Sequence, residues 1–128
     1  LWGGNLTCLL KLAGTPYWPD LSGAILFLED IDLAPDRCDC ELTQLLHMGV
    51  FDRVAGVVIG HIDGQDGVAE PGHSLGDMLV RLTQQQAFPI LKTEDFGHNC
   101  PNTVLPIGIR AHLDADALTL SLLEPPVQ

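Results

Sequence analysis

Short apolar runs constrain the fold of this chain more than any other feature. "AILFL" at 24–28 and "VAGVVIG" at 54–60 have the length of a strand and show no polar alternation. Such runs predict strands that are covered on both faces, as in a parallel sheet. "FPILK" at 88–92 predicts a third strand of the same sheet.

Helical patterns separate these runs. A first helix is expected between Asn5 as its N-cap and Gly14, and a second covers 33–49. Ser74 begins a third helix, with Asp77 at the capping-box position. Because helices alternate with buried strands, the pattern favours parallel strands with helices packed on the sheet.

The pattern changes from Leu105 onwards. "LPIGIRAHL" and "ALTLSLL" alternate and flank "DAD", which predicts an antiparallel hairpin. The expected order is α-β-α-β-α-β-β-β. A chain of 128 residues suits one domain of this α/β class, with a parallel strand core and a terminal hairpin.

Charge and cysteine spacing exclude several function classes. The net charge is −11 with only six Lys and Arg, so we expect no nucleic-acid partner. No apolar run approaches the roughly 18–20 residues of a membrane span, so no membrane partner is expected. Cys38 and Cys40 lie two apart on a predicted helix and point about 200° apart. We therefore expect neither zinc nor a disulfide, and reduced thiols as in the cytosol.

Polar side chains follow each predicted strand. In parallel sheets, functional sites gather outside the carboxyl ends of the strands. A histidine with a carboxylate partner is a common general base, and Glu29 could supply the carboxylate of such a pair. From spacing alone, a strand-end acid that only caps a neighbouring helix is the favoured interpretation of Glu29. The residues at this edge are Glu29, Asp30, His61, Asp63, Glu94, Asp95 and His98.

Other candidates are weaker. "GHSLG" at 72–76 matches the G-x-S-x-G nucleophile elbow, but no strand precedes Ser74, and a helix cap explains it. Ser22 and Ser121 are not placed as nucleophiles. His61 with Asp63 could be half of a metal site, although a solvated loop is favoured. The remaining histidines, His47, His73 and His112, are expected at the surface.

Two segments carry a family resemblance. "GGNLTCLLKLAGTPYWPDLSGAILFLED" at 3–30 and "FGHNCPNTVLPIG" at 96–108 resemble the LD-carboxypeptidases. These are muramoyltetrapeptide carboxypeptidases, and the family also includes microcin C immunity peptidases. The resemblance is to the carboxy-terminal domain, which implies a three-layer β/β/α fold of the swivelling type over residues 1–128.

The resemblance also implies a site. The family uses a Ser-His-Glu triad, whose glutamate falls on Glu29 and whose histidine falls on His98. Its serine and oxyanion-hole amides belong to an amino-terminal domain, which is the expected partner of this chain. Substrate contacts are expected from Gly3, Gly4, Asn5 and Asp30.

The implied reaction is hydrolysis of an L,D-amide bond. It would release terminal D-alanine from murein tetrapeptide during cell-wall recycling in a bacterial cytoplasm, without metal or cofactor. Family members are often dimers, so a homodimer is a further expectation. An immunity-type amidase of peptide-nucleotides and a non-catalytic dimerisation or interaction module remain open.

Overall fold

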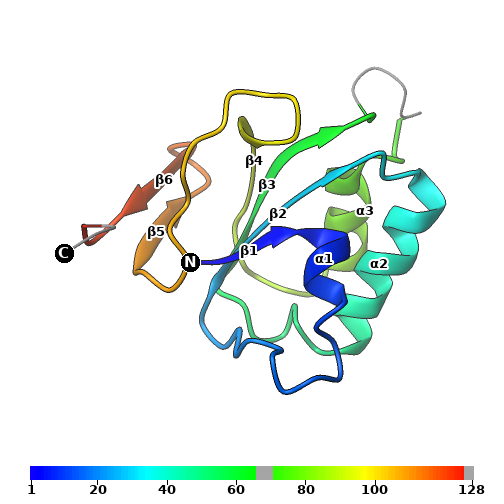
Figure 1. Ribbon diagram of the computed structural model, residues 1–128, viewed down its shortest axis with the longest axis horizontal. Helices are drawn as coiled ribbons and strands as arrows, with labels where there is room; N and C mark the ends of the chain where they lie inside the picture. Colours follow the sequence, from blue (N-terminus) through cyan, green and yellow to red (C-terminus); the bar gives the residue numbers. More distant parts are fainter. Residues whose placement is uncertain (66–70, 126–128) are drawn as a thin grey trace.

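A four-stranded parallel sheet forms the centre of the molecule. The structure is a computed structural model that describes residues 1–65 and 71–125. The strands are β1 (Trp2–Asn5), β2 (Ile25–Ile31), β3 (Gly56–Asp63) and β4 (Ile90–Gly97). They lie side by side in the order β1-β2-β3-β4, so their carboxyl ends share one edge (Figure 1).

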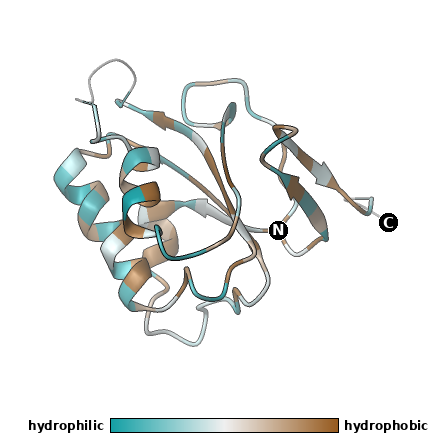
Figure 2. Ribbon diagram, turned by 180° about the vertical axis from the view of Figure 1, so that it is seen from behind, coloured by the Kyte–Doolittle hydropathy of each residue, from teal (hydrophilic) through white to brown (hydrophobic). Residues whose placement is uncertain are grey.

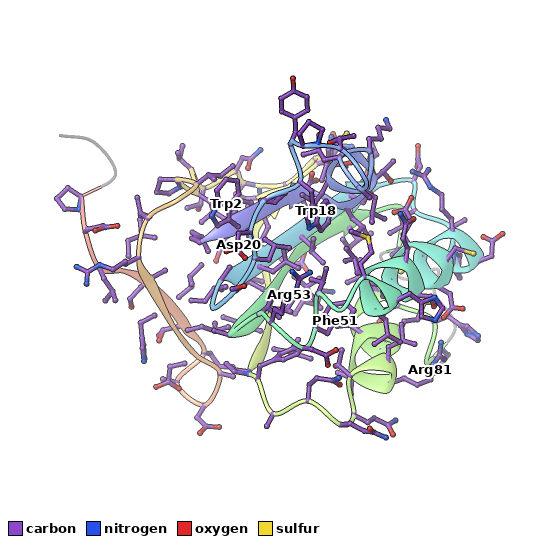
Figure 3. All side chains as sticks on the ribbon, turned by 90° about the horizontal axis from the view of Figure 1, so that it is seen from below. Trp2, Trp18, Asp20, Phe51, Arg53 and Arg81 are labelled. Atoms are coloured by element: carbon purple, nitrogen blue, oxygen red, sulfur yellow. The ribbon has the colours of Figure 1, made fainter. Side chains whose placement is uncertain are left out.

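Three helices cover one face of this sheet. They are α1 (Leu6–Leu10), α2 (Pro35–His47) and α3 (Leu75–Leu82), and Figure 1 shows them together on one side of β1–β4. Phe51 is buried between this layer and the sheet, whereas Arg81 extends outward from α3 (Figure 3). The larger core, which includes Leu26, Leu42 and Leu79, lies between the two layers.

A hairpin covers the opposite face. Strands β5 (Ala111–Asp114) and β6 (Thr119–Leu122) form a separate antiparallel sheet. A second, smaller core joins it to β2, β3 and β4. Figure 2 shows hydrophobic residues along the central strands, as expected for a sheet covered on both faces. The expected β/β/α layering with a parallel core and a terminal hairpin is confirmed.

The element boundaries differ from the sequence prediction in two respects. The chain begins with a strand, β1, that the prediction lacks, because "WGGN" has no apolar run to reveal it. The three later strands also continue past their apolar runs. Glu29, Asp30, His61, Asp63, Glu94 and Asp95 therefore lie within the strands rather than after them.

The predicted caps are confirmed. The Asn5 side chain accepts a hydrogen bond from the Cys8 amide at 2.9 Å, which begins α1. Ser74 and Asp77 form a capping box at the start of α3. The first helix is shorter than predicted. After Leu10 the chain continues in turns, in which each backbone amide donates to the carbonyl three residues earlier.

The described part of the chain contains no helix with the length and apolarity that crossing a bilayer requires.

We predict that Gly3→Ala destabilises the domain more than Gly4→Ala. Both glycines have φ of +146°, so both substitutions strain the backbone equally. A Cβ on Gly3 would lie 1.8 Å from the Phe27 carbonyl oxygen, whereas a Cβ on Gly4 meets nothing within 4 Å. Urea unfolding of the 128-residue chain should show an extra loss of roughly 1–3 kcal/mol for Gly3→Ala. Equal losses would contradict a close approach of β1 to β2.

Candidate active site

His98 and Glu29 form a hydrogen-bonded pair at the carboxyl edge of the sheet. The Nδ1 atom of His98 lies 2.5 Å from Oε2 of Glu29. Glu29 projects from β2, and His98 directly follows β4. The Glu29 side chain is 13% exposed and the His98 side chain 43% exposed. The carboxylate is therefore held largely out of water while the imidazole remains accessible.

Backbone irregularities bring these two residues together. The pairing of β2 with β3 shifts register between Leu28 and Asp30, on either side of Glu29. Such shifts often redirect side chains next to functional sites. Just before His98, Gly97 has φ of +134°, and a Cβ there would lie 2.5 Å from the His61 carbonyl oxygen. A glycine is thus required where the chain approaches β3 closely and turns toward Glu29.

The geometry determines which imidazole nitrogen is available for chemistry. An ionised carboxylate only accepts hydrogen bonds, so the neutral His98 ring carries its proton on Nδ1. Within residues 1–65 and 71–125, the Nε2 atom has no hydrogen-bond partner. Nε2 can therefore accept a proton, and Glu29 would stabilise the imidazolium that results.

A cavity of about 430 Å³ surrounds the pair. Gly4 lies in its wall, where the missing side chain leaves room because no atom lies within 4 Å of an added Cβ. Phe27 and Phe96, which pack edge to face at 5.8 Å, contribute an apolar surface. The full lining is Gly4, Phe27, Glu29, Phe96, Gly97, His98, Asn99, Asn102, Thr103 and Leu105.

Asp30 has an architectural role in this structure. It is 2% exposed and accepts hydrogen bonds from Asn5 Nδ2, from the amide and hydroxyl of Thr7, and from the Ile31 amide. Burial raises the pKa of Asp30, but these hydrogen bonds outweigh it, so the pKa lies below its ordinary value. Asp30 thereby fixes the β1–α1 junction to β2.

The four expected substrate contacts thus differ in position. Gly4 lines the cavity. Gly3 packs against the backbone of Phe27, and Asn5 is bonded to Asp30 and to the start of α1. Direct contact of a substrate with Gly3, Gly4, Asn5 or Asp30 stays a prediction.

A second histidine–carboxylate pair lies beside the first. His61 Nδ1 is 2.5 Å from Glu94 Oε2, and the His61 side chain is 12% exposed. The interpretation of His61 and Asp63 as a solvated loop is wrong, because β3 continues through both residues. Their alternation around the buried Ile62 is the signal that could have revealed the strand. The hydrogen bond from His61 lowers the pKa of Glu94.

The described residues contain no group of three or more His, Cys, Asp or Glu side chains that could hold a metal ion. Cys8, Cys38, Cys40 and Cys100 are all free thiols. Burial raises the pKa of Cys38 to about 12, which makes this thiol unreactive at neutral pH.

No serine of the described chain lines the cavity. Ser74 is bonded into its capping box, Ser22 is bonded to Asp20, and Ser121 lies on β6. The helix-cap interpretation of Ser74 is confirmed. The expected surface positions of the remaining histidines are also confirmed, since His47, His73 and His112 are exposed.

Comparison with known proteins identifies the family. Residues 1–113 match the LD-carboxypeptidase C-terminal domain. The chain belongs to this family. A putative carboxypeptidase from Synechocystis is 35% identical over 121 residues, covering 94% of this chain and 40% of that protein. The family is one of carboxypeptidases, which are hydrolases.

Solved structures agree with this assignment. Muramoyltetrapeptide carboxypeptidase from Oxalobacter formigenes has a TM-score of 0.78 and 38% identity, covering 94% of this chain and 43% of that one. The microcin C7 self-immunity protein MccF, in complex with aspartyl sulfamoyl adenosine, has a TM-score of 0.82 and 25% identity. The match covers 97% of this chain and 37% of that one. The LD-carboxypeptidase domain spans 29–40% of the length of the curated relatives that it matches.

We predict that Asp30→Asn destabilises the LD-carboxypeptidase domain by about 1–3 kcal/mol at neutral pH, because an amide nitrogen would face donors that now bond a carboxylate. A group with a lowered folded-state pKa stabilises the fold above its ordinary value of 3.8, and that contribution disappears as the pH falls further.

Urea unfolding at pH 7 and below pH 4 measures this effect. The difference in free energy of unfolding between wild type and Asp30→Asn should be smaller at the lower pH. Asp116→Asn, at an exposed turn position, is the matched control and should be neutral. An Asp30→Asn protein as stable as wild type at pH 7 would contradict the architectural role.

Proposed function

We propose that this domain supplies the general base and its orienting carboxylate to a serine peptidase. His98 is the base and Glu29 orients it, completing a Ser-His-Glu triad with a serine on an amino-terminal domain. The observation that carries this proposal is the 2.5 Å contact between Nδ1 of His98 and Oε2 of Glu29, which leaves Nε2 facing no partner in the described chain.

The proposed reaction proceeds in two stages. Nε2 of His98 takes the proton of the serine hydroxyl while the serine oxygen attacks the scissile carbonyl carbon. His98 then gives this proton to the leaving amine as the amide bond breaks and an acyl-enzyme forms. In the second stage the same nitrogen takes a proton from water, whose oxygen attacks the acyl carbon. The bond from that carbon to the serine oxygen then breaks, His98 returns the proton to the serine oxygen, and the acid is released. Glu29 stabilises the imidazolium at both stages. All three groups are side chains, so this chemistry needs no metal or cofactor.

The proposed substrate is murein tetrapeptide. The similarity to a muramoyltetrapeptide carboxypeptidase at 38% identity supports release of terminal D-alanine from an L,D-amide bond. Such a reaction belongs to cell-wall recycling in a bacterial cytoplasm. The cavity joins an apolar wall at Phe27 and Phe96 to polar groups at Asn99 and Asn102, which suits a peptide with a polar terminus.

Residues 1–128 are proposed as one carboxy-terminal domain. The hairpin strand β6 lies beyond the family match at 1–113, yet it pairs with β5, and Leu120 packs on the second core. The hairpin is therefore part of the same folding unit.

An amidase that acts on peptide-nucleotides is the second candidate. The likeness to MccF bound to aspartyl sulfamoyl adenosine supports it. Assays of the full-length protein with murein tetrapeptide and with an aspartyl-nucleotide in parallel separate the two candidates. A non-catalytic dimerisation or interaction module is less favoured, because such a module has no need of an intact His98–Glu29 pair.

We predict that His98→Ala in the full-length protein lowers kcat for D-alanine release by about a thousandfold or more. Glu29→Gln should lower kcat severely, but less than His98→Ala does, because an amide supports the wrong imidazole tautomer without removing the base. Release of D-alanine, measured by a coupled amino-acid oxidase assay, checks both values.

His112→Ala is the matched control. This histidine is exposed on β5, outside the cavity, so its removal should leave kcat unchanged. A His98→Ala protein with the activity of His112→Ala would contradict the proposed role of His98.

We further predict that the 128-residue chain alone releases no D-alanine above background. The base and carboxylate have no nucleophile to activate, and the oxyanion donors are proposed to lie on the other domain. Assay of the purified chain at high concentration checks this. Activity that Ser74→Ala abolished would show that "GHSLG" is a true nucleophile elbow and that the triad assignment is wrong.

A further inference from the structure

Asp63 bonds the loop that carries His98. Its Oδ2 accepts a hydrogen bond from Nδ2 of Asn99 at 2.7 Å, and Asn99 directly follows His98. Asp63 is the last residue of β3, and its side chain is 29% exposed. His61 Nε2 is more distant, 3.9 Å from Oδ1 of Asp63, so the contact with Asn99 is the shorter of these two.

The backbone of Asp63 is tied to the strand that carries Glu29. Asp63 pairs with Ile31 of β2, and its carbonyl accepts a hydrogen bond from the Asp32 amide at 3.0 Å. Asp63 therefore connects the strand of Glu29 to the loop of His98 by a route that is independent of the contact between them.

The His98 loop needs such a support because its backbone is strained. Asn99 has φ of +55°, a left-handed conformation that asparagine adopts more readily than most residues, and Gly97 has φ of +134°. Asn102 donates to the Gly97 carbonyl at 3.2 Å, and the Thr103 amide donates to the Asp95 carbonyl at 2.7 Å. These two bonds fix the return of the loop onto β4, but neither fixes the turn at Asn99.

We propose that Asp63 is a positioning residue for His98. Its carboxylate accepts a hydrogen bond from the side-chain amide of Asn99. This bond holds the loop so that Nδ1 of His98 faces Glu29 and Nε2 remains available to accept a proton. The effect of Asp63 on catalysis rests on the proposed triad. The effect of Asp63 on the orientation and tautomer of the His98 ring does not rest on the triad, because both can be measured in the 128-residue chain.

A polarity swap tests this proposal in the full-length protein. Asn99→Asp places two carboxylates together, and Asp63→Asn places two amides together, with little change of shape. Each should lower kcat about ten- to a hundredfold, because small displacements of a catalytic group are costly. Asp63 does not line the cavity, so Asp63→Asn should leave KM little changed. The double variant Asp63→Asn/Asn99→Asp restores a donor and an acceptor with the same total charge, and should recover most of kcat.

Two further variants separate the contact from other effects. Asn99→Gly keeps the left-handed backbone without the side chain, and it should lose as much activity as Asn99→Asp. Asp116→Asn removes a carboxylate at an exposed turn and should leave kcat unchanged. Asn99 is itself exposed, so its substitution does not disturb the core.

Nitrogen-15 NMR of the imidazole in the 128-residue chain gives a second readout. His98 should hold its proton on Nδ1 in the wild type, shift toward Nε2 in each single variant, and return to Nδ1 in the swap. Single variants with wild-type kcat and wild-type tautomer, or a swap no better than either single variant, would overturn the proposal. If His98→Ala leaves full-length activity intact, the proposed function fails, while the NMR result still decides the role of Asp63.

Discussion

The hydrogen bond between His98 and Glu29 joins residues 69 positions apart in sequence, and the rest of the site depends on it. These residues come from β2 and from the end of β4, which are separated by β3. Because β2, β3 and β4 run parallel to one another, the carboxyl ends of β2 and β4 lie at the same edge of the sheet. The contact is thus a consequence of topology, and the topology is a consequence of apolar runs that must be covered on both faces.

Two cores stabilise the edge that carries the pair. The helical layer packs on one face of the sheet and the hairpin packs on the other, with Phe27 and Phe96 from β2 and β4 in the second core. Phe96 lies two residues before His98, and Phe27 lies two residues before Glu29. Each member of the pair is therefore close in sequence to a buried side chain that fixes its strand. A rigid support of this kind suits a base whose task requires a fixed orientation.

Physical patterns in the sequence predicted the parallel strands, the helices packed on them and the terminal hairpin, whereas the pairing of Glu29 with His98 was implied by the family resemblance. Continuous apolar runs, caps at Asn5 and Ser74, and the alternation after Leu105 are local signals, so they can be interpreted without a structure. The strand of Trp2–Asn5 has no such signal, because Gly3 is fixed by close contact with Phe27 from a distant part of the chain. The pair of His61 and Glu94, and the bond from Asn99 to Asp63, depend on strand register. Register cannot be derived where polar residues continue a strand past its apolar run.

We propose that this domain activates a serine that lies outside residues 1–128. Labelling of the full-length protein with a fluorophosphonate, followed by peptide mapping, tests this claim most directly, because such probes react with activated serines. The account predicts one labelled serine outside residues 1–128, with labelling abolished by His98→Ala and slowed by Glu29→Gln. Labelling of Ser22, Ser74 or Ser121, or labelling that is indifferent to His98, would contradict it.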